Sequence, residues 1–261
     1  MFEFHQDLER YFNMQYWTSK EYIIPFLKQC NVPWEGKRVL ELGCAEAGVL
    51  KAFVEEGSEC MGIDMDSQRV ENAKKLQAEA VQKGQLSFST KNVYDIDIQK
   101  DLKGGFDIII LKDVIEHIPQ QEKFIPLLKN FLNPKGVIFF GFPPWQMPFG
   151  GHQQILAHKT LSKLPWIHLL PNFIYGPLVK YFTNEESRVG MLEIKSTGIS
   201  IERFESIIKK SDLQVIGRTF FLFNPIYKYK FGLEVKTIPK LLSQIPFFRN
   251  FYTTGVYYIV A

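Results

Sequence analysis

The residues of this chain that are best suited to binding chemistry each follow a short apolar run. Glu41 leads into a turn of small residues at positions 43–48, where Gly43 lets the backbone pass close to a ligand because it has no Cβ. The helix that we expect after this turn offers free N–H groups at its start. An ordinary strand-turn-helix without a ligand is the alternative interpretation of this segment alone.

A carboxylate stands at the end of the next apolar run. Asp64 closes the run of residues 60–63, about 20 residues after the turn, where an Asp or Glu accepts both hydrogen bonds of a ribose diol in nucleotide-binding α/β folds. Asp66 directly precedes Ser67 and fits a helix cap better than Asp64 does. The two segments together indicate a nucleotide site.

Candidate acid–base residues follow a longer apolar run, residues 106–111. Lys112 and Asp113 come directly after it, and His117 stands next to Glu116. An imidazole has a pKa range suited to a general base. Glu116 and His117 could equally cap the next helix, so both interpretations stay open.

Short apolar runs alternate with amphipathic stretches from residue 37 onward, which indicates βαβ units and a mostly parallel α/β sheet with helices on both faces. The polar residues after the strands should then lie close together, because ligands of a doubly wound sheet bind at the carboxyl ends of its strands. We expect strands at 38–42, 60–63, 86–89, 106–111 and 136–141, helices at 47–56, 67–82, 120–131 and 201–210, an extended segment at 213–223 and a last strand at 253–260.

A second candidate base lies just after the fifth of these strands. His152 follows the glycine pair at 150–151, and from there it could reach the hydroxyl group of an acceptor molecule. It competes with His117 for the role of base. An ordinary loop residue is the alternative interpretation of His152.

Length and composition limit the class of protein. A chain of 261 residues with 46% apolar and 23% charged residues fits one large α/β domain. A net charge of +3 without a Lys/Arg block gives no reason to expect a nucleic acid partner. The three cysteines fit neither a zinc site nor a redox pair, and we expect no metal. Because the start of the chain lacks a signal-peptide pattern and no long apolar run occurs, we expect a cytoplasmic location.

Residues 39–48 resemble motif I of the class I S-adenosylmethionine (SAM)-dependent methyltransferases, Glu/Asp-x-Gly-x-Gly-x-Gly, with alanines in place of the second and third glycines. The resemblance implies that SAM is the cofactor. It also implies that Glu41, Gly43 and Ala45 line the methionine end of SAM, with Cys44 in the same loop. The implied fold is a Rossmann-like, doubly wound sheet of seven strands, of which the last is antiparallel.

The resemblance continues through the second and third strands. It implies that Met65, next to the ribose-binding Asp64, packs on the adenine ring. Residues 91–97 look like the family's Gly-Asp-Ala-x-x-Leu stretch. By this match Asn92 would contact the adenine edge and Val93 would supply backbone, with Asp95 as the rival to Asn92.

The resemblance spans residues 39 to 141, with secondary matches from residue 200 onward, and it includes the segment after the fourth strand. The Glu-His pair at 116–117 is similar to the ubiquinone-biosynthesis-like branch of the family. Lys112 and Asp113 would then lie at the mouth of the cofactor site. Because the motifs occur in the expected order on the expected elements, together they favour this family more than any one of them does.

Three rival interpretations stay open. A nicotinamide-dependent dehydrogenase is disfavoured because Ala45 stands where Gly-x-Gly-x-x-Gly requires its second glycine, and because no Tyr-x-x-x-Lys pattern serves hydride transfer. A non-catalytic SAM-binding protein would keep the loop and Asp64 but lack a base. The Glu-His pair is also compatible with a lipid-modifying enzyme similar to the cyclopropane synthases.

The acceptor side is expected outside the shared core. We divide the chain into an N-terminal helical segment or lid (1–36), a SAM-binding core (37–141), a substrate-side insertion (142–199) and a C-terminal completion of the sheet (200–261). The insertion is rich in proline and aromatic residues. It forms either a small satellite core or a pocket for a hydrophobic acceptor.

Basic and aromatic residues alternate between positions 227 and 252, where five lysine and arginine residues occur with one acid, Glu234. Such a stretch could lie on an anionic membrane surface. We therefore expect methyl transfer to an oxygen of a small-molecule acceptor that is hydrophobic or lipid-linked, with peripheral contact at a membrane. Transfer to nitrogen or carbon is the alternative.

Overall fold

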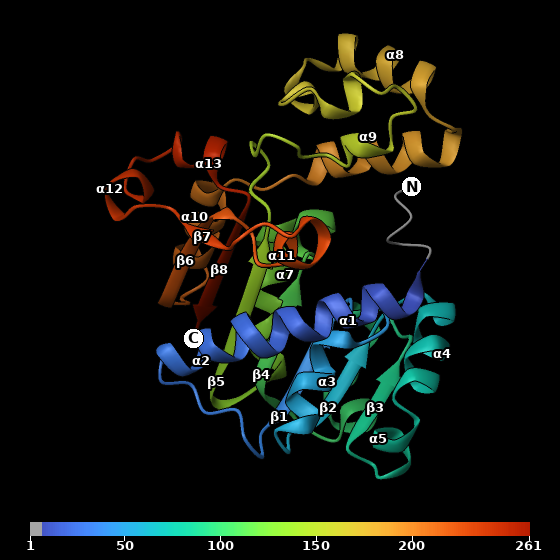
Figure 1. Ribbon diagram of the computed structural model, residues 1–261. Coiled ribbons are helices and arrows are strands. Elements are labelled where there is room, and N and C mark those ends of the chain that lie inside the picture. The colour runs from blue at the N-terminus through green and yellow to red at the C-terminus, as the bar shows by residue number, and fades with distance from the viewer. Residues whose placement is uncertain (1–6) are drawn as a thin grey trace.

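An eight-stranded sheet runs through the part of the chain that this computed structural model describes, residues 7–261 (Figure 1). Its strand order is β3-β2-β1-β4-β5-β8-β6-β7. The strands are β1 (Arg38–Leu42), β2 (Glu59–Ile63), β3 (Leu86–Ser89), β4 (Phe106–Lys112), β5 (Leu132–Phe142), β6 (Val215–Phe223), β7 (Lys236–Thr237) and β8 (Gly255–Val260).

The pairing within the sheet confirms the predicted doubly wound fold. Strands β1 to β5 pair in parallel, whereas β8 lies antiparallel between β5 and β6. The two-residue strand β7, which the sequence pattern does not indicate, pairs with β6 at the edge and accounts for the eighth strand.

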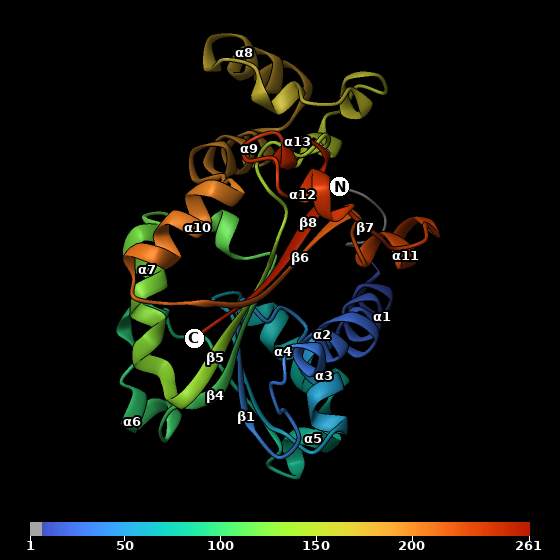
Figure 2. The ribbon, with the colours of Figure 1, turned by 90° about the vertical axis from the view of Figure 1, so that its left-hand side faces the viewer.

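Helices cover both faces of the sheet (Figure 2). One face carries α1 (Leu8–Thr18), α2 (Ile24–Gln29) and α3 (Gly48–Glu55), and the other carries α6 (Ile98–Leu102), α7 (Gln121–Leu127) and α10 (Ile201–Lys210). A π-helical stretch, Ser19–Ile23, joins α1 to α2. The helices α4 (Ser67–Leu76) and α5 (Ala78–Gln82) follow β2.

Strand β4 shows why the sheet is apolar on both faces. Ile108 and Ile110 pack with the α1–α3 side, while Ile109 and Leu111 pack with the α7 and α10 side. All four side chains are fully buried. Successive strand residues point to opposite faces, so a strand covered by helices on both sides reads as a continuous apolar run.

The region after β5 leaves the sheet and forms its own small core. It contains α8 (Asn172–Phe182) and α9 (Glu185–Thr197) together with three short 3₁₀ turns. Leu156, Ile167, Tyr175, Val179 and Met191 form a separate buried cluster there. The satellite core expected from the sequence is therefore present.

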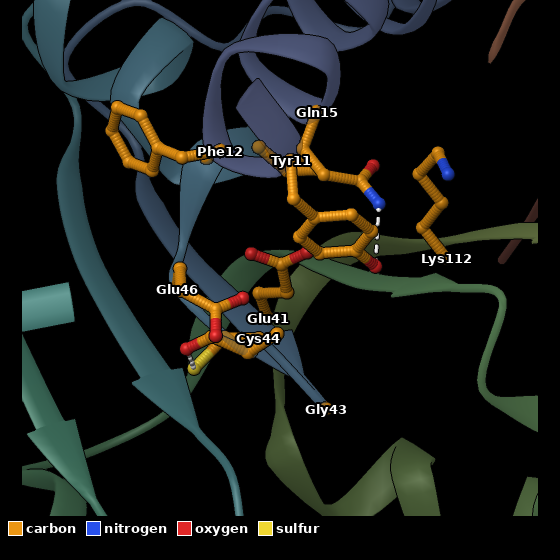
Figure 3. A pocket seen from close by; sticks show the side chains of 11 residues that line it. Tyr11, Phe12, Gln15, Glu41, Gly43, Cys44, Glu46 and Lys112 are labelled. Carbon is orange, nitrogen blue, oxygen red and sulfur yellow. Dashed lines mark hydrogen bonds between the residues drawn. The ribbon is translucent and has the colours of Figure 1, made fainter. Parts of the chain in front are cut away.

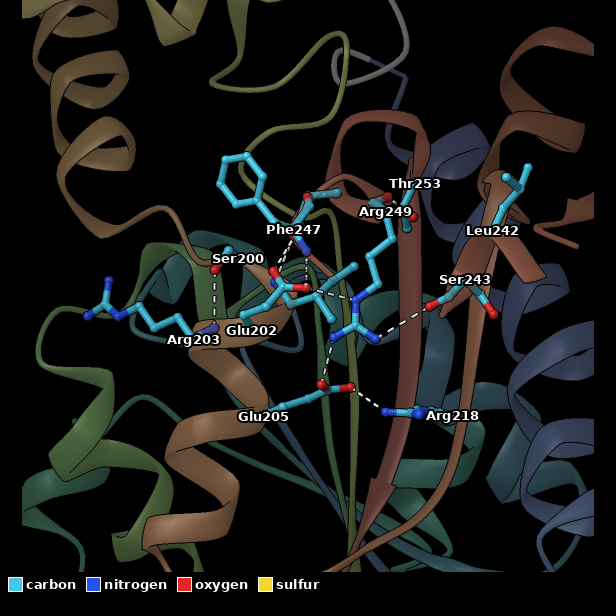
Figure 4. A network of polar contacts seen from close by, with 12 residues as sticks. Ser200, Glu202, Arg203, Glu205, Arg218, Leu242, Ser243, Phe247, Arg249 and Thr253 are labelled. Atoms are coloured by element: carbon cyan, nitrogen blue, oxygen red, sulfur yellow. Dashed lines mark hydrogen bonds and ion pairs between the residues drawn. The ribbon is translucent and has the colours of Figure 1, made fainter. Parts of the chain in front are cut away.

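The C-terminal region returns to the sheet and adds α11 (Ile226–Phe231), α12 (Lys240–Ser243) and α13 (Arg249–Tyr252). The buried guanidinium of Arg249 fixes this region to α10, because its Nε lies 2.8 Å from Glu202 Oε1 and its Nη2 lies 2.7 Å from Glu205 Oε2 (Figure 4). None of the helices within residues 7–261 is long and apolar enough to cross a membrane.

Candidate functional site

The loop after β1 adopts the backbone that the glycine-rich motif usually provides, although it holds only one of the three motif glycines. Gly43, Ala45 and Ala47 have φ angles of 68°, 49° and 60°, all in the left-handed region. This conformation costs an L-residue with a side chain roughly 1–2 kcal/mol. A Cβ on Gly43 would lie 2.6 Å from a methyl carbon of Val114, so glycine is required at this position.

A polar pocket lies between this loop and α1 (Figure 3). From α1 come Tyr11, Phe12 and Gln15, whose amide nitrogen donates a hydrogen bond of 2.9 Å to the Tyr11 hydroxyl. The helix packs closely, because a Cβ on Gly48 would lie 2.3 Å from the Phe12 carbonyl oxygen. The remaining lining residues come from β1, its loop, α3 and β4: Glu41, Gly43, Cys44, Ala45, Glu46, Gly48, Val49 and Lys112.

Glu41 is the most unusual group of this pocket. Its side chain is buried, and Oε2 has no hydrogen-bond partner among the described residues. Burial raises the pKa of Glu41 well above its usual range, while the nearby Lys112 opposes the shift and Asp64 adds to it. Buried carboxylates without a partner are rare in folded proteins. The geometry therefore provides a carboxylate that can receive a cation or a hydrogen-bond donor.

Lys112 and Asp113 form an ion pair at the end of β4, with Nζ 2.5 Å from Oδ2. The lysine side chain is buried, and the aspartate side chain is 41% exposed. Burial lowers the pKa of Lys112, but Asp113, together with Tyr11 and Glu41, more than compensates and raises it above its usual value. The pair thus keeps one buried positive charge beside the pocket.

Asp64 connects the loops after β1 and β2. Its Oδ2 accepts a hydrogen bond of 2.7 Å from the Ala45 amide, and its Oδ1 accepts one of 3.0 Å from the Asp66 amide. Asp66 caps α4 by accepting from two amides of the first turn, as its position before Ser67 predicts. Met65 between them is 70% exposed, so its side chain is available to a ligand.

Asn92 and Val93 follow β3 at the same edge of the sheet. The Asn92 side-chain oxygen accepts a hydrogen bond of 3.1 Å from the Tyr94 amide and begins a 3₁₀ turn, Val93–Asp95. Val93 is half-buried against the core, whereas Asn92 and Asp95 are exposed. The Asp64 amide donates to the Ser89 carbonyl oxygen, so this loop lies next to the one after β2.

The two candidate bases lie together although the sequence separates them. The rings of His117 and His152 stack with centroids 5.4 Å apart and planes inclined by 23°. His117 ends a 3₁₀ turn, Ile115–His117, and His152 follows the loop after β5. Part of the His117 ring is exposed, yet burial of the rest lowers its pKa, and the carboxylate of Asp113 opposes this shift.

Two parts of the site are absent from the sequence motifs. The first is the contribution of α1, because an amphipathic helix carries no pattern that specifies where it docks. The second is the environment of Glu116, whose side chain is buried and lines a second, apolar pocket. Within residues 7–261, no group of three or more His, Cys, Asp or Glu side chains is arranged to hold a metal ion.

Residues 34–162 match a family described as "Methyltransferase domain". The chain is 29% identical over 138 residues to a ubiquinone biosynthesis O-methyltransferase of Pasteurella multocida, covering 49% of this chain and 56% of that protein. It is 31% identical over 109 residues to the enzyme of that name from Actinobacillus pleuropneumoniae, covering 40% and 45%. The chain thus spans about half the length of these curated relatives.

Two solved structures share the fold. The first is PKMT2 from Rickettsia typhi in complex with AdoHcy, with a TM-score of 0.58, 20% identity, and coverage of 93% of this chain and 53% of that one. The second is a putative sarcosine dimethylglycine methyltransferase from Galdieria sulphuraria, with a TM-score of 0.60, 12% identity, and coverage of 93% and 84%. The matching domain and the curated relatives support the family predicted from the motifs, the class I SAM-dependent methyltransferases, and the two solved structures share its fold.

Proposed function

We propose that this chain binds SAM in the pocket between α1 and the loop after β1 and transfers its methyl group to an oxygen of a hydrophobic small-molecule acceptor. The observation that carries the proposal is the buried Glu41, whose Oε2 has no partner among the described residues, beside a backbone loop in the conformation of motif I. When bound, SAM supplies a methyl group on a sulfonium sulfur. Positioning then governs the transfer.

The residues of the polar pocket fit the charged end of SAM. Glu41 can accept hydrogen bonds from the ammonium group of the methionine moiety, and Gln15 can contribute a polar side chain from α1. Gly43, Cys44 and Ala45 would form the floor of this end. Helix α1 covers it and excludes water, which is the role expected of the N-terminal segment.

The residues after β2 and β3 fit the nucleoside end. Each carboxylate oxygen of Asp64 accepts one amide hydrogen bond and keeps capacity for another, so it can also accept from a ribose diol. Met65 is exposed and can pack on the adenine ring. Asn92, or Asp95 in the alternative register, can meet the adenine edge beside the Val93 backbone.

The stacked histidines fit the role of a base on the acceptor side. Since the pKa of His117 is lowered, its ring is neutral at neutral pH and can accept a proton from an acceptor hydroxyl. His152 lies against it and is the second candidate. Lys112 and Asp113 would stand at the boundary between the cofactor and the acceptor.

A hydrophobic acceptor is supported by two observations. The curated relatives are named as O-methyltransferases of ubiquinone biosynthesis. In addition, the segment around α12 exposes large apolar side chains, with Leu241 81% and Phe248 63% exposed, near Lys236 and Lys240. We propose that this segment gives a cytoplasmic protein peripheral contact with an anionic membrane surface.

Transfer of labelled methyl groups from SAM to the organic-solvent extract of a cell lysate tests the proposed function. We expect label in the extract with the wild-type chain and a strong loss with Asp64→Ala. Label in the aqueous fraction alone would contradict a hydrophobic acceptor, and label in neither fraction would favour a non-catalytic SAM-binding protein. We expect the protein to co-sediment with phosphatidylglycerol vesicles but not with phosphatidylcholine vesicles. A protein that sediments with neither kind of vesicle would exclude the membrane contact.

A further inference from the structure

A second pocket lies beside the segment that follows β4. Lys112 lines the polar pocket, and Glu116, shortly after it in the chain, lines the second one. Apart from Glu116, the described residues that line this second pocket carry no ionisable side chain: they are Pro143, Pro144, Trp145, Met147, Gly150, Gly151, Ile194, Gly198 and Ile199. It is therefore an apolar pocket with one polar group.

That polar group has an unsatisfied atom. The Glu116 side chain is 5% exposed, and its Oε2 has no hydrogen-bond partner within the described part of the chain. Burial, with the nearby Asp113, raises the pKa of Glu116 well above its usual range, which favours the protonated carboxyl group. Proteins rarely leave a buried polar group without a partner unless a ligand or a function supplies one.

The walls hold Glu116 in place. The buried Gln121 amide donates hydrogen bonds of 2.8 Å to the Ile115 carbonyl oxygen and 2.6 Å to the Thr197 carbonyl oxygen. The Thr197 hydroxyl in turn donates to the Glu116 carbonyl oxygen at 2.6 Å. These bonds tie the 3₁₀ turn that carries Glu116 to the end of α9, so the pocket is formed before any ligand enters.

Trp145 fixes the opposite wall. Its amide donates a hydrogen bond of 2.9 Å to the Ile199 carbonyl oxygen. Its ring packs so closely on Gly198 that a Cβ there would lie 2.4 Å from Trp145 Cε3. Trp145 and Gly198 both line the pocket, so they give it a rigid, apolar wall.

Both candidate bases directly follow residues that line the pocket. His117 directly follows Glu116, and His152 directly follows Gly151, which lines the pocket. The two rings stack on each other. The segments that carry both candidate bases therefore border the pocket, although neither ring is among the residues that line it.

We propose that this apolar pocket binds the methyl acceptor and that the Glu116 carboxyl group donates a hydrogen bond to a hydroxyl or carbonyl oxygen of it. The inference rests on the proposed function and specifies its substrate class: a neutral, largely apolar molecule with one such oxygen. An anionic group is disfavoured among these walls because they offer it no partner of opposite charge. Glu116 acts here as a specificity-determining residue.

Binding of 4-propylphenol and of 4-propyltoluene, which has a methyl group in place of the hydroxyl, tests the proposal. Met147 lines the pocket, so its ¹³C-labelled methyl group reports on occupancy by NMR, with Met147→Leu to assign the peak. We expect 4-propylphenol to shift this peak and to bind about tenfold more tightly than 4-propyltoluene. Equal affinities for the two compounds would overturn the proposal, and so would spectral changes that leave the Met147 peak unshifted. Both results are obtained with the wild-type protein and need no variant of Glu116.

Two variants of Glu116 sharpen the test. Glu116→Gln keeps a donor and an acceptor and should preserve the preference for 4-propylphenol. Glu116→Met removes the polar group and should abolish it, whereas a preference that survives in Glu116→Met would contradict the proposed role. Calorimetry with SAM on the same samples separates the two claims: wild-type protein that binds 4-propylphenol but not SAM would refute the proposed function alone.

Discussion

The two pockets that Lys112 and Glu116 line each contain a buried carboxyl group with an unpartnered oxygen among the described residues, but their surroundings differ. Glu41 lies in a pocket that also holds Lys112, Gln15 and Glu46. Glu116 lies among proline, tryptophan, methionine, isoleucine and glycine residues. The same side chain is thus suited to a charged ligand in the first pocket and to a neutral ligand in the second.

The difference follows from how each pocket is built. The polar pocket is formed by the loop after β1, the ends of β1 and β4, and the adjoining parts of α1 and α3, at the edge of the parallel sheet where backbone amides and polar side chains gather. The apolar pocket is bounded by the start and the end of the 142–199 insertion and depends on packing. Under the proposals above, the shared fold provides the cofactor side and the insertion provides the acceptor side.

The largest expected effect concerns the base on the acceptor side. We predict that His117→Ala lowers kcat by about 10²–10⁴-fold, because loss of a general base typically has that effect. SAM affinity should change little. Initial rates at saturating SAM measure this, with His158→Ala, in the satellite region, as the matched control.

His152→Ala gives the contrasting case. If His117 is the base, this variant should lower kcat by no more than about tenfold through loss of the stacked neighbour. A larger fall in kcat in His152→Ala than in His117→Ala would identify His152 as the base. An unchanged kcat in both variants would exclude a histidine base.

Glu41→Gln tests the polar pocket, because it keeps the shape of the side chain and removes the carboxylate that would pair with the ammonium group of SAM. We expect the Kd for SAM to rise about 10–100-fold, since hydrogen bonds between charged groups are worth about 1.5–3 kcal/mol. Calorimetry measures the change. The matched change Glu116→Gln should leave the Kd within a small factor, and equal losses in both variants would contradict the division between the pockets.

The region around the apolar pocket should lose stability at low pH because it contains His168. His168 is buried, with Nε2 2.7 Å from the Trp145 carbonyl oxygen, and burial lowers its pKa from 6.5 to about 4. Its neutral form is favoured in the folded chain, so its contribution to stability is complete above about pH 6.5 and is lost as the pH falls toward 4. We expect the free energy of unfolding to fall by about 2 kcal/mol between pH 8 and pH 5.

Urea unfolding at these two pH values measures this effect. His168→Gln should remove that part of the pH dependence, while the matched variant His158→Gln should keep it. Because His168 supports Trp145, binding of 4-propylphenol should weaken on acidification more than binding of SAM does. Identical pH dependence in His168→Gln and the wild type would contradict this account.

The smallest expected effect concerns the strained loop of the cofactor side. Ala45 has a φ of 49°, so Ala45→Gly should raise the free energy of unfolding by up to about 1 kcal/mol. The matched change Ala80→Gly, within α5, should lower it by about 1 kcal/mol. Thermal or urea unfolding measures both, and a loss of stability in Ala45→Gly would show that the left-handed backbone is not strained.

The cofactor side could largely be predicted from the sequence, because its elements are local. A strand, a small-residue turn and a helix lie together in residues 38–55, and their periodicity indicates each element. The position of Asp64 after the second strand follows from the parallel sheet. The left-handed backbone at Ala45 was not predicted, since alanine rarely adopts it.

The acceptor side could be predicted only in part, because its contacts are distant in sequence. The stacking of His117 on His152 depends on the path of the loop after β5, which no periodic pattern describes. The burial of Glu116 depends on Thr197 and Gln121, which fix its turn to α9. The docking of Tyr11 and Gln15 over the cofactor loop likewise has no signature within α1 itself.

The most direct test of the account is a calorimetric titration of the wild-type chain and of Asp64→Ala with SAM and with NAD. We predict that one SAM molecule binds per chain, that NAD produces no binding heat, and that Asp64→Ala weakens SAM binding by about tenfold or more. Binding of NAD without binding of SAM, or unchanged SAM affinity in Asp64→Ala, would contradict the proposed cofactor site.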